Sequence, residues 1–183
     1  MKKKSVIAIT VAILLLTLTF AGSCLYVRLT GRGNGVTTVW GSDVEALSDA
    51  ICKGCKNERE KVYAIYDWVT LNITYDYEFD TEYQYFDIDR TLSTRKGICF
   101  DFSNLFCALC RSQNISCYVV DGYNRTNKAN LHTWNRVLFD GNWWNLDTSC
   151  DAPRRAAGKS LYGFVQLANY DSQDKEYVIT RIY

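Results

Sequence analysis

The apolar and polar positions divide the chain into a helical part followed by a part rich in strands. Four apolar residues recur at i, i+3, i+4 and i+7, which predicts a helix with one face toward a core: Val62, Ile65, Tyr66 and Val69. Capping-box patterns at Ser42 and Asn57 predict the starts of a short helix, ended by Gly54, and of this longer one. A third helix is predicted from Cys99 to about Ser112. Helices therefore dominate the chain up to this point.

Strand patterns follow the third helix. Four strands are expected from short runs of β-branched and aromatic residues: 115–123, 131–139, 143–148 and 177–182. Asp140-Gly141-Asn142 is a hairpin signal between the second and third of them. We also expect an extended piece at 72–75, an acidic, tyrosine-rich surface loop at 76–90, and a helix or loop at 159–168. Helices followed by an antiparallel sheet indicate an α+β fold.

The N-terminus has the features of an export signal. A basic stretch, Met1 to Lys4, precedes an apolar run, and Gly22-Ser23 stands directly before Cys24. This end resembles a bacterial lipoprotein box, in which Cys24 would be lipidated and would become the new N-terminus. An uncleaved membrane anchor and ordinary secretion are the alternatives.

The domain boundaries follow from this signal. We expect residues 1–23 to be a lipoprotein-type signal peptide or membrane anchor, 24–41 a flexible tether, and 42–183 a single folded domain. The domain would face outward in every case, because the positive flank of the signal stays inside. Its attachment to the cell membrane would run through the N-terminal lipid or anchor.

Charge and composition narrow the class of partner. The chain of 183 residues has a formal net charge of +1 and no basic stripe, so we expect no nucleic-acid binding. The acids of the 76–90 loop do not have the spacing of a calcium loop, and we expect no metal and no cofactor. We also expect a monomer.

The eight cysteines are many for this length, and their meaning depends on the compartment. With Cys24 and Cys99 set aside, six remain, and an oxidising exterior predicts at least one disulfide without fixing the pairing: Cys52, Cys55, Cys107, Cys110, Cys117 and Cys150. Two CxxC pairs also permit a zinc site. The second pair lies inside the predicted third helix, which favours core thiols or a disulfide to Cys117 instead.

The candidate chemistry consists of a thiol, an imidazole and a carboxylate, in that order along the chain. Cys99 is predicted at a helix N-terminus, where unpaired N–H groups and the helix dipole favour a thiolate. His132 is the only histidine. It and Asp147 lie on adjacent strands of the predicted hairpin. We expect Asp147 to accept from the Nδ1–H group of His132, which leaves Nε2 for the thiol.

Each of these residues also has a plain structural interpretation. Cys99 could be a small core residue, His132 a packed strand residue, and Asp147 a turn former. The three types in this order make the catalytic interpretation stronger than any of the three alone. The backbone N–H of Cys99 would be one oxyanion donor. A second donor is expected upstream, and the alternatives are Trp40, Gln84 and Tyr85.

Four motifs carry a family resemblance over roughly residues 57–152. They are Lys96-Gly97-Ile98-Cys99-Phe100-Asp101, Val119-Val120-Asp121-Gly122-Tyr123, His132-Thr133-Trp134-Asn135 and Trp143-Trp144-Asn145-Leu146-Asp147. The chain resembles the bacterial transglutaminase-like superfamily. The resemblance implies a papain-like α+β core with Cys99 as nucleophile, His132 as base and Asp147 as orienting residue. Thr133 stands where the family commonly has Ala, and Asp147 lacks the usual following Pro.

The expected function is thiol-dependent acyl transfer or hydrolysis on peptide or protein amide bonds, outside the cytoplasm. The family includes cross-linking enzymes, amidases, peptidases and members without activity, and the residues do not decide between water and an amine as acceptor. The alternative is a catalytically silent, surface-anchored module that binds peptide or glycan through an aromatic rim of Trp134, Trp143 and Trp144.

Overall fold

The computed structural model describes residues 38, 40–78, 87–166 and 177–183. Its helices are α2 (Ser42–Ile51), α3 (Glu58–Asn72), α4 (Ile88–Thr94), α5 (Cys99–Ser112) and α6 (Thr148–Ala156). Its strands are β1 (Thr74–Tyr75), β2 (Lys96–Gly97), β3 (Cys117–Asn124), β4 (Leu131–Phe139), β5 (Asn142–Leu146), β6 (Val165–Gln166) and β7 (Tyr177–Ile182). The predicted signal peptide, the lipidation residue Cys24 and most of the tether lie outside the described residues.

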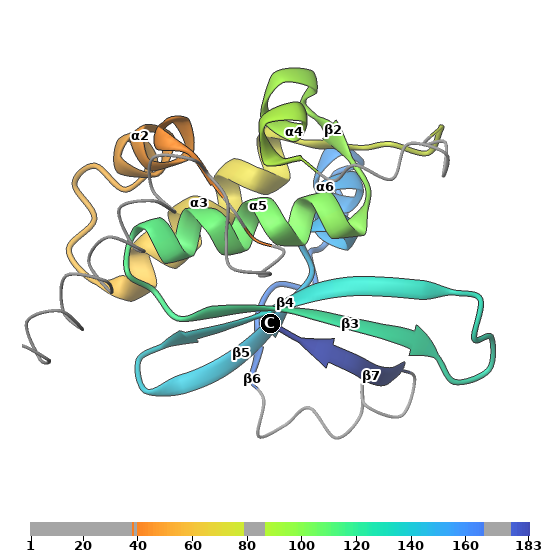
Figure 1. The fold of residues 1–183 in the computed structure, drawn as a ribbon. Coiled ribbons are helices and arrows are strands. Elements are labelled where there is room, and N and C mark those ends of the chain that lie inside the picture. Colours follow the sequence, from red (N-terminus) through yellow and green to blue (C-terminus); the bar gives the residue numbers. More distant parts are fainter. Residues whose placement is uncertain (1–37, 39, 79–86, 167–176) are drawn as a thin grey trace, which may run out of the picture.

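The strands and helices form two layers, and the predicted α+β class is confirmed (Figure 1). The order β6-β5-β4-β3-β7 makes a five-stranded sheet in which each neighbouring pair is antiparallel. The helices lie on one side of this sheet, and α5 runs along it. A separate parallel pair, β1 with β2, leads into α5.

Helix α5 is the centre of the core. Its residues from Asp101 to Cys110 are all buried, which the predicted apolar period of this segment anticipated. It contacts α2, α3 and α6 among the helices, and β3 and β4 in the sheet. Helix α5 is therefore packed between the other helices and the sheet.

The hairpin prediction is also confirmed. Phe139 pairs with Asn142, which leaves Asp140 and Gly141 as a two-residue turn. Both have positive φ, 49° and 70°, as a type I′ turn requires. This turn sets the register that pairs Asn135 with Leu146 and so fixes where Asp147 leaves β5.

Several sequence predictions were incomplete or wrong. Helix α4 occupies part of the segment expected to be a loop, and α6 was missed. Helix α6 contains Pro153 in its second turn, where proline usually argues against a helix. The expected helix or loop at 159–168 has no helix among its described residues and contains β6.

The expected disulfide is not formed. All seven cysteines of the described chain are free thiols. Cys107, Cys110 and Cys117 are buried in the core, and burial raises the pKa of each thiol. None of the helices in the described ranges combines the length and apolar content needed to span a bilayer.

Candidate active site

Cys99 lies at the position that the sequence predicted, the first residue of α5. The preceding residue, Ile98, is extended and forms the N-cap. An isoleucine side chain has no acceptor for the N–H groups of the first helical turn, and no side-chain cap bond forms there. The N-terminus of α5 therefore presents its dipole to the surroundings of the Cys99 thiol.

Asp101 secures this helix start from inside the helix. Its Oδ2 accepts a hydrogen bond of 2.8 Å from the Ile98 backbone N–H. Burial raises the pKa of Asp101, although this hydrogen bond acts in the opposite direction. Gly97 makes room for the carboxylate, because a Cβ at this position would lie 2.5 Å from the Asp101 Cβ. The Gly97-x-x-x-Asp101 spacing thus helps to position Cys99, which lies between these two residues.

His132 and Asp147 form a hydrogen-bonded pair. His132 Nε2 lies 2.5 Å from Asp147 Oδ2. His132 lies on β4 as predicted, but Asp147 lies just after β5 and not on it. The predicted contact through Nδ1 is also wrong, because Nε2 makes it. Asp147 follows Leu146, which pairs with Asn135, so Asp147 lies diagonally across from His132. The outer nitrogen Nε2 spans this longer distance, which leaves Nδ1 as the nitrogen free of the carboxylate.

Asp147 has a second role that the sequence analysis missed. It is the N-cap of α6, and its Oδ1 accepts from the Cys150 backbone N–H at 3.0 Å and from Ser149 Oγ at 2.6 Å. Burial would raise the pKa of Asp147, but the hydrogen bonds and charge of His132, together with Ser149 and Cys150, lower it. The carboxylate is therefore ionised and fixed in orientation by one helix start.

Cys150 also belongs to this site, although its sequence context indicated only one of six cysteines available for disulfide bonds. It occupies the third position of α6, where the cap brings its side chain back toward Asp147. One donor atom each of His132, Asp147 and Cys150 lie within 4.8 Å of one another. The D-x-x-C spacing after a strand was the available signal, but it required recognition of Asp147 as a helix cap.

Two thiols act on the same imidazole. Burial would lower the pKa of His132, but hydrogen bonds with Asp147, Cys150 and Cys99 and the charge of Asp147 raise it. The structure thus brings together all three predicted residues, Cys99, His132 and Asp147, and adds Cys150 to them. Such a cluster can hold an imidazolium between a carboxylate and sulfur.

Tyr75 is a further neighbour that the sequence analysis did not single out. Its strand β1 pairs with β2 so that Tyr75 lies opposite Gly97, two residues before Cys99. Burial raises the pKa of Tyr75, as do the nearby Cys99, Cys150 and Asp147, while His132 acts in the opposite direction. Among the predicted second oxyanion donors, Trp40 packs against the core, and Gln84 and Tyr85 lie outside the described residues.

An open cavity of about 320 Å³ adjoins the pair. Its lining includes His132, Asp147, Cys150, Trp134, Tyr162 and Tyr177. The rings of Trp134 and Tyr177 lie 5.7 Å apart and the ring of Tyr177 lies 5.6 Å from that of His132, so aromatic side chains form one wall.

The predicted rim of three tryptophans is only partly correct. Trp134 lines the cavity, but Trp143 stacks on Tyr118 and Trp144 stacks on Phe139. Trp144 is one of the partly buried residues packed against the core. The aromatic wall of the cavity is therefore made by Trp134 with Tyr177, and Trp143 and Trp144 have structural roles in the sheet.

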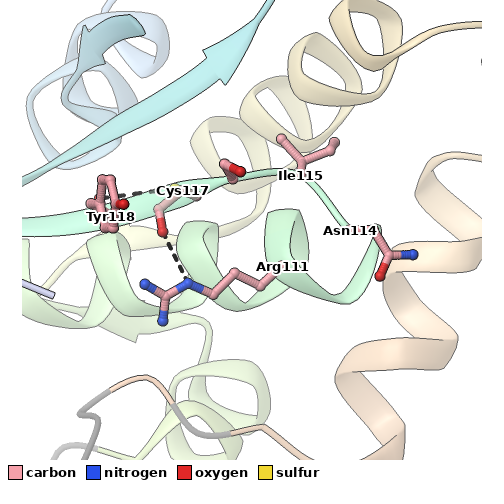
Figure 2. Close-up of a pocket in the computed structure, with 6 residues that line it drawn as sticks. Arg111, Asn114, Ile115, Cys117 and Tyr118 are labelled. Atoms are coloured by element: carbon pink, nitrogen blue, oxygen red, sulfur yellow. Dashed lines mark hydrogen bonds between the residues drawn. The ribbon is translucent and has the colours of Figure 1, made fainter.

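A second cavity of about 300 Å³ lies at the other end of α5 (Figure 2). Arg111 Nε donates to the Cys117 carbonyl across it at 2.9 Å. The cavity is lined by Arg111, Asn114, Ile115, Ser116, Cys117 and Tyr118. It contains neither an imidazole nor a carboxylate, so it lacks the groups that activate a thiol.

Comparison with known proteins identifies relatives of this chain. Residues 45–148 match the sequence model of the transglutaminase-like superfamily. Kyphoscoliosis peptidase of Mus musculus is 29% identical over 136 residues, which are 68% of this chain and 20% of the peptidase. The Homo sapiens protein of the same name is 30% identical over 119 residues, 59% of this chain and 18% of its own length. The chain thus spans about a fifth of these relatives.

A solved structure supports the fold. The periplasmic domain of TgpA from Pseudomonas aeruginosa superposes with a TM-score of 0.51 at 20% identity, over 73% of this chain and 49% of that one. At this identity the likeness concerns the fold alone.

Proposed function

Because the chain belongs to the transglutaminase-like superfamily, we propose that it is a thiol-dependent enzyme acting on amide bonds of peptides or proteins. The observation that carries the proposal is the 2.5 Å contact between His132 Nε2 and Asp147 Oδ2, beside a thiol at the first residue of α5. Packed catalytic side chains on rigid elements are what covalent catalysis requires.

The proposed reaction begins at Cys99. Its thiolate attacks the carbonyl carbon, and the backbone N–H of Cys99 donates to the oxygen on which negative charge develops. His132 takes the thiol proton through Nδ1, since Nε2 is engaged by Asp147. The imidazolium then protonates the departing amine, and an acyl-enzyme remains. Asp147 keeps the imidazole in place and stabilises its charge.

The second half of the reaction decides the type of enzyme. Water gives hydrolysis, and a primary amine gives transfer of the acyl group. We propose hydrolysis as the main outcome. Both relatives are named as peptidases, and the open cavity beside His132 admits water.

We also propose that the domain acts outside the cytoplasmic membrane, held there through Cys24 or an uncleaved N-terminal anchor. The support is the basic start, apolar run and small residues before Cys24. Mass measurement of the mature N-terminus in the native host would show a lipid on Cys24. An unmodified, secreted chain that starts at another residue would contradict this placement.

The main test maps which thiol reacts first. A limiting amount of an iodoacetamide probe, followed by peptide mass analysis, should label Cys99 well before Cys55, a partly exposed thiol on another part of the domain. His132→Ala should slow the labelling of Cys99 and leave that of Cys55 unchanged. Equal rates at both cysteines would favour the silent binding module. Faster labelling of Cys150 would show that Cys150 is the nucleophile and that the proposal names the wrong cysteine.

A second assay separates hydrolysis from transfer. A glutamine-containing peptide is incubated with a labelled primary amine, and the products are read by mass. Hydrolysis predicts loss of ammonia or peptide cleavage without gain of the amine. Incorporation of the amine as the main product would contradict the hydrolytic proposal while leaving the thiol chemistry intact.

A further inference from the structure

The cluster of His132, Asp147 and Cys150 combines three kinds of metal ligand in one place. One atom each of the imidazole, the carboxylate and the thiol lie within 4.8 Å of one another. All three residues are partly exposed and line the open cavity. We propose that these residues bind a transition-metal ion, Zn²⁺ foremost, and that the bound ion reversibly switches the site off.

The local structure prepares two of the ligands. Asp147 and Cys150 are the cap and the third residue of one helix, so α6 sets their separation. Ser149 Oγ and the Cys150 N–H hold Asp147 by Oδ1, which leaves Oδ2, the oxygen that faces His132, to bind the ion. Hydrogen bonds of this kind behind a ligand fix its orientation and strengthen binding.

The donor set selects the kind of ion. Sulfur, nitrogen and a single carboxylate suit Zn²⁺ and similar ions, which bind with three protein ligands and an open fourth position. Ca²⁺ and Mg²⁺ prefer shells of oxygen and would find only one carboxylate here. The ion enters from the cavity of about 320 Å³, and the thiol of Cys150 releases its proton to solvent as the sulfur–metal bond forms.

The consequence for activity rests on the proposed function, whereas metal binding rests on the geometry alone. An ion bound to Nε2 of His132 and to Asp147 replaces the hydrogen bond between them. The neutral ring then carries its single proton on Nδ1, so Nδ1 cannot accept a proton from Cys99. The ion is therefore an inhibitor of the thiol chemistry and not a cofactor for it.

Cobalt provides a direct readout of binding. Co²⁺ added to the metal-free protein should give a thiolate-to-metal charge-transfer band in the near ultraviolet. The band should persist in Cys55→Ser, the matched thiol control, and disappear in Cys150→Ser. Titration calorimetry with Zn²⁺ should show about a 100-fold or greater weakening in Cys150→Ser. His132→Gln serves as a second ligand variant and should lose binding as well.

The outcomes separate the two proposals. A charge-transfer band that survives in folded Cys150→Ser, or that is lost in Cys55→Ser, would overturn the metal site. Zn²⁺ binding at Cys150 without any amide-bond activity would keep the site and reject the proposed function. The activity of each variant is compared with its own metal-free rate. If Zn²⁺ does not lower the activity, the proposed inhibition is rejected, whereas the proposed enzymatic function still stands.

Discussion

The two helices that meet at His132 begin in opposite ways. Helix α5 has Ile98 as its cap, and the carboxylate of its third residue, Asp101, reaches back to the Ile98 N–H. Helix α6 has Asp147 as its cap, and this carboxylate accepts from the N–H of its third residue, Cys150. Each helix uses one half of the reciprocal capping box.

This difference gives the two thiols different surroundings. Cys99 follows a residue without a side-chain acceptor, and the carboxylate that secures its helix is buried on the core side. Cys150 lies against His132, which lowers its pKa, but burial and the charge of Asp147 outweigh this and raise it. An anion that caps a helix and faces a thiol in its first turn therefore opposes formation of the thiolate. The comparison supports the two proposals, that Cys99 is the nucleophile and that Cys150 is the metal-binding thiol.

Removal of each thiol in turn gives the largest expected contrast. Cys99→Ala should lower the rate of amide hydrolysis by about 1,000-fold or more, because the proposed acyl-enzyme forms on the sulfur of Cys99. Cys150→Ala should cause a much smaller fall. Initial rates with a fluorogenic peptide, measured with EDTA present, test this. Equal losses in the two variants would mean that the two helix starts do not have different roles.

Asp147→Asn tests the charge at the start of α6 while keeping its cap, since an amide oxygen still accepts from the Cys150 N–H. We expect a fall in kcat of about 100- to 10,000-fold, because the neutral amide no longer stabilises the imidazolium. Circular dichroism should show an intact fold. A variant with nearly normal kcat would show that His132 works without this carboxylate.

The same variant should change how stability depends on pH. Asp147 has a pKa below its ordinary value of 3.8, so its stabilising contribution is present above that pH and is lost as the pH falls through the lowered pKa. The pKa of His132 is raised from 6.5. Its contribution to the free energy of unfolding is therefore complete below pH 6.5, declines above this pH, and is lost above the raised pKa.

The stability difference between wild type and Asp147→Asn should therefore be larger at about pH 5.5 than at about pH 9. Urea unfolding in EDTA measures the free energy of unfolding at both values. A difference that grows toward alkaline pH would contradict the ion pair.

Much of this arrangement was predictable because it rests on local signals. The apolar period after Cys99 predicted α5, and Asp140-Gly141 predicted the hairpin that brings β4 and β5 together. The diagonal register that turns Nε2 toward Asp147 depends on where β5 ends. Tyr75 reaches the site because β1 pairs with β2 in parallel. No local sequence signal predicts this pairing. Helix α6 was missed because residues 143–148 were predicted to form one strand, and because proline is unfavourable inside a helix, as at Pro153.

Gly97→Ala tests the start of α5. Its new Cβ would lie 2.5 Å from the Asp101 Cβ and 2.9 Å from Oδ2, so the carboxylate or the β2 backbone must move. We expect a loss of about 1–3 kcal/mol in the free energy of unfolding, with lower activity as Cys99 shifts. Gly41→Ala is the control, because nothing lies within 4 Å of its added Cβ. Equal stability of the two variants would contradict the packing role of Gly97.

Ser149→Ala tests the smallest contribution, which is the hydrogen bond to the Asp147 carboxylate oxygen that does not face His132. Ser149 Oγ donates to Asp147 Oδ1 at 2.6 Å, and its loss leaves the Cys150 N–H as the remaining partner of that oxygen. We expect a cost of about 1 kcal/mol and a fall in kcat of a few-fold. Ser93→Ala, which removes an exposed hydroxyl bonded within α4, should cost less. If both variants behave alike, Asp147 is held by the helix backbone alone and its orientation needs no support from Ser149.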